Sequence, residues 1–120
     1  MAYEASFGEW VQEHFAGLGP LTVKRMFGGA AVYANGLIFA LLDDGVVWLK
    51  ADDQNKSLLR EAGARQFTYP TKAGQVMTMA YWSLPEPALD DPDEAVRWAR
   101  MSVDAALRKA AAKKPRKKKL

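Results

Sequence analysis

The residues that could do chemistry in this chain are few and far apart. His14 is the only histidine and there is no cysteine, so thiolate catalysis, disulfides and cysteine-bound zinc are excluded. A histidine base needs a nucleophile and an orienting carboxylate, and the sequence around His14 supplies neither. His14 also falls on the apolar side of a predicted helix, which favours a structural role. We therefore predict no catalytic residue, no metal site and no cofactor.

Neighbouring acids and neighbouring glycines are the other candidates. Asp43-Asp44 and Asp52-Asp53 are better explained as a turn and a helix start than as metal ligands, because a hard cation needs several converging oxygens. Gly28-Gly29 is not followed by the Lys-Ser/Thr pair of a phosphate loop. A strand pattern comes next, so the pair indicates a bulge or a close backbone approach.

The strongest charge signal lies at the C-terminus. Six of the last eight residues are cationic: Lys113, Lys114, Arg116, Lys117, Lys118 and Lys119. Of the 17 Lys and Arg residues this leaves 11 in residues 1–112, against 14 acids, so the body carries a net charge of −3. Two interpretations remain open: a solvated tail, or a segment that binds phosphate backbones weakly and without base specificity. The acidic body argues against nucleic-acid binding by the folded part.

The elements that must position these residues are best defined between residues 25 and 50. Asn35-Gly36 and Asp44-Gly45 can adopt positive φ, which two-residue hairpins require. We predict three antiparallel strands, at residues 30–34, 37–42 and 46–50. Alternation along the second strand predicts one shared face for Leu37, Phe39 and Leu41.

Apolar spacing and stop signals predict the remaining elements. Helices are expected at residues 3–17, 52–62 and from Asp91 to Pro115, an extended segment at 22–27, and strands at 66–69 and 76–82. Asp91 should cap the last helix, whose wet face carries Arg100, Asp104 and Arg108 at the i, i+4 spacing of ion pairs. The order α-β-β-β-α-β-β-α predicts an α+β two-layer sandwich with a five-stranded, mainly antiparallel sheet.

The length of 120 residues predicts one domain, residues 1–112, followed by a disordered Lys-rich tail at 113–120. No apolar run approaches the ~20 residues of a membrane span, and the N-terminus is acidic where a signal peptide is basic. We therefore expect a cytoplasmic protein that does not enter membranes. A homodimer is left open, through an exposed strand edge at 46–50 or 76–82.

One set of residues forms a recognisable motif pattern: Arg25, Met26, Phe27, Gly28, Gly29, Tyr33, the turn at Asn35 and Gly36, Phe39, Ala40, Trp48, Lys50, Phe67, Tyr69, Met79, Tyr81, Pro85 and Trp98. This pattern resembles the N-terminal domain of the TfoX/Sxy family, regulators of bacterial competence genes. The resemblance covers about residues 5–110. It implies the fold α-β(3)-α-β(2)-α, similar to secretion-chaperone-like domains.

The resemblance implies a non-enzymatic co-regulator that acts through protein partners or a promoter complex. Full-length family members add a second, helical domain, whereas this chain offers a Lys tail and is expected to be a single-domain member. Arg25 and Lys50 are candidate surface contacts by motif match, and the alternative for both is local ion pairing with Asp43, Asp52 or Asp53. The alternative function is a small-molecule binding module that uses an aromatic groove between the sheet and the last helix.

Overall fold

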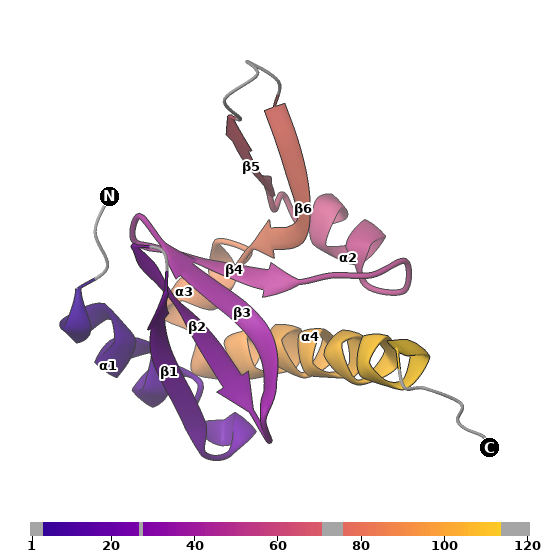
Figure 1. The fold of residues 1–120 in the computed structure, drawn as a ribbon. Coiled ribbons are helices and arrows are strands. Elements are labelled where there is room, and N and C mark those ends of the chain that lie inside the picture. The colour runs from indigo at the N-terminus through magenta and orange to yellow at the C-terminus, as the bar shows by residue number, and fades with distance from the viewer. Residues whose placement is uncertain (1–3, 27, 71–75, 114–120) are drawn as a thin grey trace.

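The computed structural model describes residues 4–26, 28–70 and 76–113, and every structural statement below concerns these residues (Figure 1). The chain runs through α1 (Ala5–His14), a 3-10 turn η1 (Ala16–Leu18), β1 (Leu21–Met26), β2 (Gly29–Ala34), β3 (Leu37–Asp43), β4 (Val46–Lys50), α2 (Lys56–Glu61), β5 (Gln66–Pro70), β6 (Val76–Ser83), α3 (Pro87–Asp90) and α4 (Pro92–Lys113). The predicted α+β class is confirmed.

The sheet has six strands, and the predicted number of five is wrong. The strand order is β1-β2-β3-β4-β6-β5, and every neighbouring pair is antiparallel. The additional strand is β1, which pairs with β2 from Leu21↔Ala34 to Met26↔Gly29. The segment Leu21–Met26 is therefore a full strand of the sheet. Gly28, with a φ of 82°, turns the chain towards β2.

The edges of the sheet are β1 and β5. The strands at 46–50 and 76–82, which the sequence left open as possible edges for a homodimer, are interior strands, since β4 lies between β3 and β6, and β6 lies between β4 and β5. Figure 1 shows β5 and β6 as a hairpin that stands away from β1, β2 and β3. On the β1 edge, Lys24 and Arg25 are exposed, and such charges discourage pairing with a second chain.

Both predicted hairpin turns are confirmed. Asn35 and Gly36 have φ values of 53° and 80°, and Asp44 and Gly45 have 54° and 76°. Two successive residues with positive φ form the turn whose twist matches that of the flanking strands. These turns fix the β2-β3-β4 meander that the sequence predicts.

A bulge in β3 overturns the predicted shared face of Phe39 and Leu41. Val32 pairs with Ala40, but the next residue of β2, Tyr33, pairs with Ile38. Phe39 is the extra residue, and it joins Ala40 in the core. Leu41 faces the opposite side of the sheet, where it lies across from Trp48.

The core lies between one face of the sheet and the helices. Val11 and Phe15 of α1, Val32 and Leu49 of the sheet and Ala99 of α4 belong to one buried cluster. In Figure 1, α3 and the start of α4 lie behind the sheet. We call the opposite side of the sheet the open face; it carries Ala31, Tyr33, Leu41, Trp48, Lys50 and Tyr81.

The helices differ from the predictions mainly at their ends. Helix α2 begins at Lys56 rather than near Asp52, and α3 was not predicted, because the prolines around it were interpreted only as stop signals. The cap of α4 is confirmed, since a carboxylate oxygen of Asp91 accepts hydrogen bonds from the backbone N–H groups of Asp93 and Glu94. No helix of the described residues is long and apolar enough to cross a membrane.

Candidate functional site

The motif residues of the chain do not converge on one site. Tyr33, Lys50 and Tyr81 lie on the open face, and Lys50 is the cross-strand neighbour of Tyr81. Trp98 packs against the core from α4, and Pro85 is buried. Tyr33 and Lys50 are therefore partly exposed on this face beside the buried Tyr81, whereas Trp98 and Pro85 maintain the fold.

The glycines and the first residues of the motif serve the backbone and the edge strand. Gly28 and Gly36 adopt positive φ in turns. A side chain at Gly29 would collide with the backbone carbonyl oxygen of Leu42, which confirms the predicted close approach. Arg25 is exposed on β1 and Met26 is half-buried, and Phe27 lies outside the described residues.

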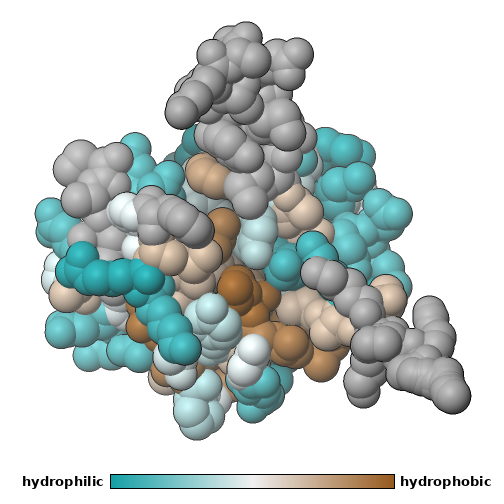
Figure 2. Space-filling model, viewed as in Figure 1, coloured by the Kyte–Doolittle hydropathy of each residue, from teal (hydrophilic) through white to brown (hydrophobic). Residues whose placement is uncertain are grey.

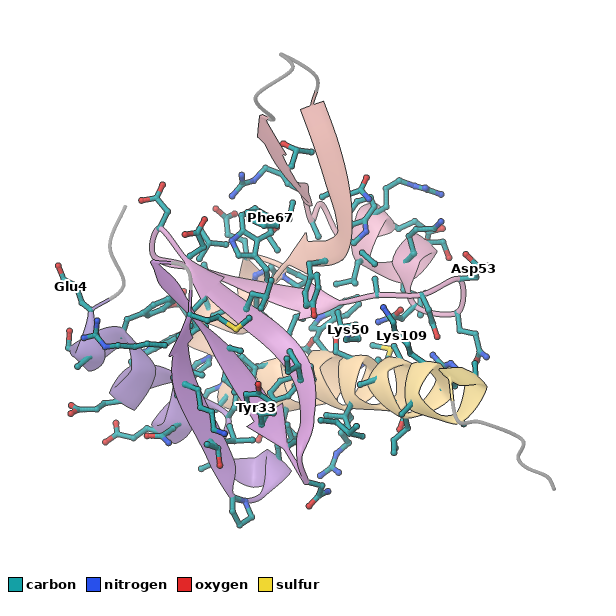
Figure 3. The ribbon with its side chains drawn as sticks, in the orientation of Figure 1. Glu4, Tyr33, Lys50, Asp53, Phe67 and Lys109 are labelled. Carbon is teal, nitrogen blue, oxygen red and sulfur yellow. The ribbon has the colours of Figure 1, made fainter. Side chains whose placement is uncertain are left out.

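Three cations lie over three aromatic rings on the open face. Lys24 Nζ is 5.4 Å from the centre of the Tyr33 ring and Lys50 Nζ is 5.0 Å from that of Tyr81. The guanidinium of Arg65 is 5.5 Å from the Trp48 ring, and Phe67 packs against the same ring at 4.8 Å. Cation–aromatic contacts hold long side chains in place without neutralising their charge. Figure 3 shows Tyr33, Lys50 and Phe67 spread across this face.

The phenol of Tyr81 on this face has a raised pKa. Burial raises the pKa of the Tyr81 phenol, and the nearby Tyr33 adds to the rise. The ordinary pKa of a tyrosine is already about 10, so Tyr81 stays protonated at physiological pH. It can donate a hydrogen bond but cannot serve as a base.

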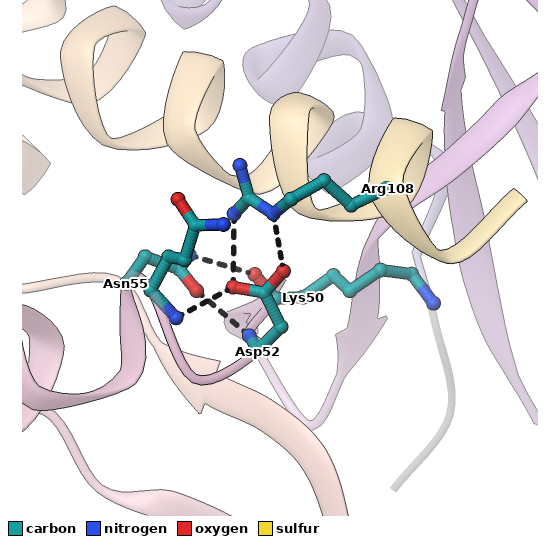
Figure 4. A network of polar contacts seen from close by, with 5 residues as sticks. Lys50, Asp52, Asn55 and Arg108 are labelled. Atoms are coloured by element: carbon teal, nitrogen blue, oxygen red, sulfur yellow. Dashed lines mark hydrogen bonds and ion pairs between the residues drawn. The ribbon is translucent and has the colours of Figure 1, made fainter. Parts of the chain in front are cut away.

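A polar network lies where β4 leads into α2 (Figure 4). Arg108 of α4 donates two hydrogen bonds to the Asp52 carboxylate, from Nε at 2.6 Å and from Nη2 at 2.9 Å. This bidentate contact lowers the pKa of Asp52. The buried Asn55 accepts a hydrogen bond from the Asp52 N–H at 2.7 Å and donates one to the Lys50 carbonyl at 3.2 Å. The network therefore ties α4 to the end of β4.

These ion pairs differ from the predicted ones. Arg108 pairs with Asp52 rather than with Asp104, and the carboxylate of Asp53 lies 3.5 Å from Lys56 Nζ in an exposed pair. Residues 52 and 108 are far apart in the sequence, so no local spacing could reveal their contact. The sequence also did not single out three further cations, because their neighbours lie on other elements. These cations are Lys24, Arg65 and Lys109.

A hollow of about 270 Å³ opens beside the network, between the end of β4 and the second half of α4. We call it the basic hollow; it is lined by Lys50, Ala51, Asp52, Ala80, Ala105, Arg108 and Lys109. A second hollow of about 300 Å³ adjoins it and includes Trp82. A third, of about 390 Å³, lies between the start of β4 and α3. None of the described residues that line the basic hollow is aromatic, so these residues do not form the aromatic groove that the sequence offered as an alternative.

His14 has a structural position, as the sequence predicts. Its Nε2–H donates to the carbonyl of Ala88 at 2.7 Å, and its ring stacks on Trp10 with 4.4 Å between centres. The buried contact joins α1 to α3. Within residues 4–26, 28–70 and 76–113, no group of three or more His, Asp or Glu side chains could hold a metal ion.

The basic tail is only partly within the described residues. Lys113 is the last residue of α4. The other cations, Lys114, Arg116, Lys117, Lys118 and Lys119, lie outside the described residues, and so does the predicted helix end at Pro115. The proposed roles of these residues rest on the sequence.

Comparison with known proteins places the chain beside one family. The family model of the TfoX N-terminal domain matches residues 13–106. Protein Sxy of Escherichia coli (strain K12) is 27% identical over 107 residues, which are 89% of this chain and 51% of that protein. The chain therefore spans about half the length of the curated relative that it matches.

Proposed function

The chain belongs to the TfoX N-terminal domain family, and from this premise we propose that it regulates transcription of competence genes by binding a protein partner. The observation that carries the proposal is the family match, which extends from α1 to α4 and so includes both layers of the fold.

The chemistry of the described residues supports binding rather than catalysis. The His14 Nε2–H is engaged by a carbonyl, and Tyr81 is held in its protonated form. Asp52 accepts two hydrogen bonds from Arg108 and one from the Gln54 N–H. Its charge is thus compensated, whereas a catalytic carboxylate needs a substrate proton within reach.

The open face is the proposed partner surface. Figure 2 shows hydrophobic atoms in the middle of the molecule, where β3 curves towards α4, with hydrophilic residues on both sides. Tyr33 and Leu41 are partly exposed on this face, and Lys24 lies at its β1 margin. An apolar centre with a charged rim is typical of protein interfaces, and the cations favour a partner whose matching surface is acidic.

The C-terminal cations add a second, weaker activity to the proposal. Lysines recognise charge and not base sequence, so the tail would increase affinity for nucleic acid without choosing a promoter. The partner would then provide the specificity.

Affinity capture from native lysate tests the proposal. The full chain is compared with the double variant Lys24→Glu/Tyr33→Ala, and nuclease is added to half of each sample. We expect a protein that survives nuclease and is lost with the double variant. The matched control is Arg97→Glu/Leu107→Ala on the exposed side of α4, which should retain the protein.

Deletion of the gene should also lower transcripts of DNA-uptake genes. Capture that disappears entirely with nuclease would contradict the partner role.

A further inference from the structure

The open face has the composition of a sheet face that another layer covers. Each of the four described α-helices contributes to the core cluster on the opposite face, through residues that include Val11, Leu59, Ala88 and Ala99. An antiparallel sheet with one face in water usually alternates apolar and polar residues along its strands. On the open face the central strands β2, β3 and β4 instead carry apolar or aromatic residues at four neighbouring positions: Ala31, Tyr33, Leu41 and Trp48.

One row of cross-strand neighbours crosses the open face from β1 to β4. Lys24 pairs with Ala31, Ala31 with Leu41, and Leu41 with Trp48. Residues directly opposite each other in a sheet share a face, so these four side chains all belong to the open face. Three strand spacings of about 4.8 Å make the row about 14 Å long. We call these four residues the cross-strand row.

Each end of the cross-strand row carries a cation, whereas its middle is apolar. Lys24 is exposed at the β1 end, and the exposed Arg65 has its guanidinium 5.5 Å from the Trp48 ring at the β4 end. Neither cation forms an ion pair with another described residue. Leu41, between them, is partly exposed. The acid Asp43 lies on the same face, but at the end of β3 and outside the row. A surface that complements the row is therefore acidic, then apolar, then acidic again.

A second copy of this chain does not complement the row. In a two-fold contact centred on the row the same patch meets itself, so Lys24 and Arg65 of one copy would face the cations of the other. Like charges placed opposite each other oppose association. The occupant is therefore a different chain.

An α-helix with acidic flanks fits both the charges and the width of the row. With its side chains a helix is about 10–12 Å wide, so the two flanks of its apolar stripe come close to cations that are about 14 Å apart. Helices also cover the opposite face of this sheet, and packing of helices on a sheet is a common way to bury an apolar face.

We propose that the cross-strand row binds an amphipathic helix of the partner protein, which lies along β2 and β3 with its apolar stripe on Leu41 and with acidic residues against Lys24 and Arg65. This inference rests on the proposed partner role and specifies the element of the partner that binds. The bound helix gives the sheet a third layer. An extended peptide added to the edge strand β1 would instead pair with backbone groups and leave Leu41, two strands away, without a contact.

The test is the affinity of the full chain for a designed, fluorescently labelled peptide helix that has a stripe of Leu flanked on both sides by Glu. Fluorescence anisotropy at 150 mM salt measures it, because distant charges are screened over ~8 Å at this ionic strength. For Lys24→Gln/Arg65→Gln we expect the affinity to fall by about 5- to 25-fold, since each exposed charge pair changes affinity by up to about fivefold. Leu41→Ala should lower it by about fivefold or more.

Matched controls remove the same groups elsewhere. Arg60→Gln/Arg97→Gln removes two exposed cations from α2 and α4, and Leu107→Ala truncates an exposed leucine of α4. Both variants should bind the peptide as wild type does. An exchange of charge provides a gain of binding that unfolding cannot produce: Lys24→Glu/Arg65→Glu should bind a peptide with Lys in place of Glu about fivefold or more tightly than wild type does.

The inference is overturned if wild type does not bind the Glu-flanked peptide, or if the row variants and their controls bind it equally well. Circular dichroism that shows the bound peptide to be non-helical would also overturn it, and so would sedimentation that shows a dimer lost in Leu41→Ala. A protein captured from lysate that the peptide does not displace would overturn the helix site and leave the partner role standing. Peptide binding at the row without any captured protein would support the helix site and contradict the partner role alone.

Discussion

Ser102 is a polar residue at a fully buried position on the inner side of α4. The buried positions around it on this helix, Ala95, Ala99 and Ala106, are alanines. Within the described residues its Oγ has no hydrogen-bond partner. A buried hydroxyl without a partner costs about 1–3 kcal/mol in the folded state, because it has given up its hydrogen bonds to water.

Replacing Ser102 by alanine should therefore stabilise the protein. We expect Ser102→Ala to raise the free energy of unfolding by about 1 kcal/mol, since the change removes the buried hydroxyl and introduces a better helix former. Urea unfolding monitored by circular dichroism measures the difference. The matched control is Ala99→Ser, which adds a hydroxyl at another fully buried position and should destabilise by a similar amount. A loss of stability in Ser102→Ala would show that the hydroxyl has a partner.

Single residues could be predicted from the sequence where their role is local. The helix cap at Asp91 follows from neighbours a few positions away. The structural role of His14 was predicted from the apolar side of its helix, although its partner Ala88 lies 74 residues away. The partner of Arg108 could not be predicted in this way. Its helical spacing favoured Asp104, whereas the fold supplies Asp52, which is better placed for two parallel hydrogen bonds.

At the scale of strands and turns, features with a local cause could also be predicted, whereas features that depend on distant residues could not. The turns at Asn35-Gly36 and Asp44-Gly45 were predicted because the required φ belongs to the residues themselves. The bulge at Phe39 could not be predicted from the sequence, because it depends on which residues of β2 pair with which residues of β3. The number of strands was wrong for a related reason: β1 is recognised as a strand only through its pairing with β2.

The start of β2 depends on a glycine for space rather than for φ. Gly29 lies where its missing side chain would meet the backbone carbonyl oxygen of Leu42 on β3. A backbone atom cannot move aside as the end of a flexible side chain can. Gly28, next to it, has open space but a φ of 82°. The two neighbouring glycines are therefore required for different reasons.

We expect Gly29→Ala to lower the free energy of unfolding by about 1–3 kcal/mol, because the added methyl group forces β2 and β3 apart. Thermal unfolding provides the measurement. Asparagine separates the two causes, since it tolerates positive φ better than alanine. Gly28→Asn should be milder than Gly28→Ala, whereas Gly29→Asn should be no better than Gly29→Ala. A Gly29→Ala variant as stable as wild type would contradict the close approach.

The free energy of unfolding should depend on pH through the ion pair of Asp52 and Arg108, which joins the sheet layer to the helix layer. Arg108 lowers the pKa of Asp52, so the folded state holds this proton less tightly than the unfolded state. The stabilisation is then complete above the ordinary aspartate pKa of about 3.9 and is lost as the pH falls through the lowered value. Both side chains are about one-third exposed, so solvent screens part of the effect.

We therefore expect Asp52→Asn to be less stable than wild type at pH 7, with a difference that shrinks below about pH 4. Asparagine retains an oxygen that can accept the Gln54 N–H, so the change isolates the charge. Urea unfolding of both proteins from pH 7 to pH 3 makes the comparison, and added salt should narrow the gap at pH 7. A gap that does not change with pH would contradict a charge-dependent pair.

At the scale of the whole molecule, the class and the meander were predictable, but the basic hollow was not. Its cations belong to β4 and α4, and the antiparallel sheet and the helix layer must both form before Lys50 and Lys109 meet. The sequence alone indicated an acidic body with a basic tail, because a net charge averages over the surface and hides where the charges lie.

The arrangement of charge along α4 makes the molecule an electric dipole. Acids gather at residues 86–94, before and at the start of the helix, and cations gather at its end, so the side-chain dipole is directed against that of the helix backbone and exceeds it. A dipole in the field of a polyanion experiences a torque before any contact is made. The protein should therefore rotate as it diffuses towards such a surface, and its first collision should occur with the C-terminal end of α4 in front.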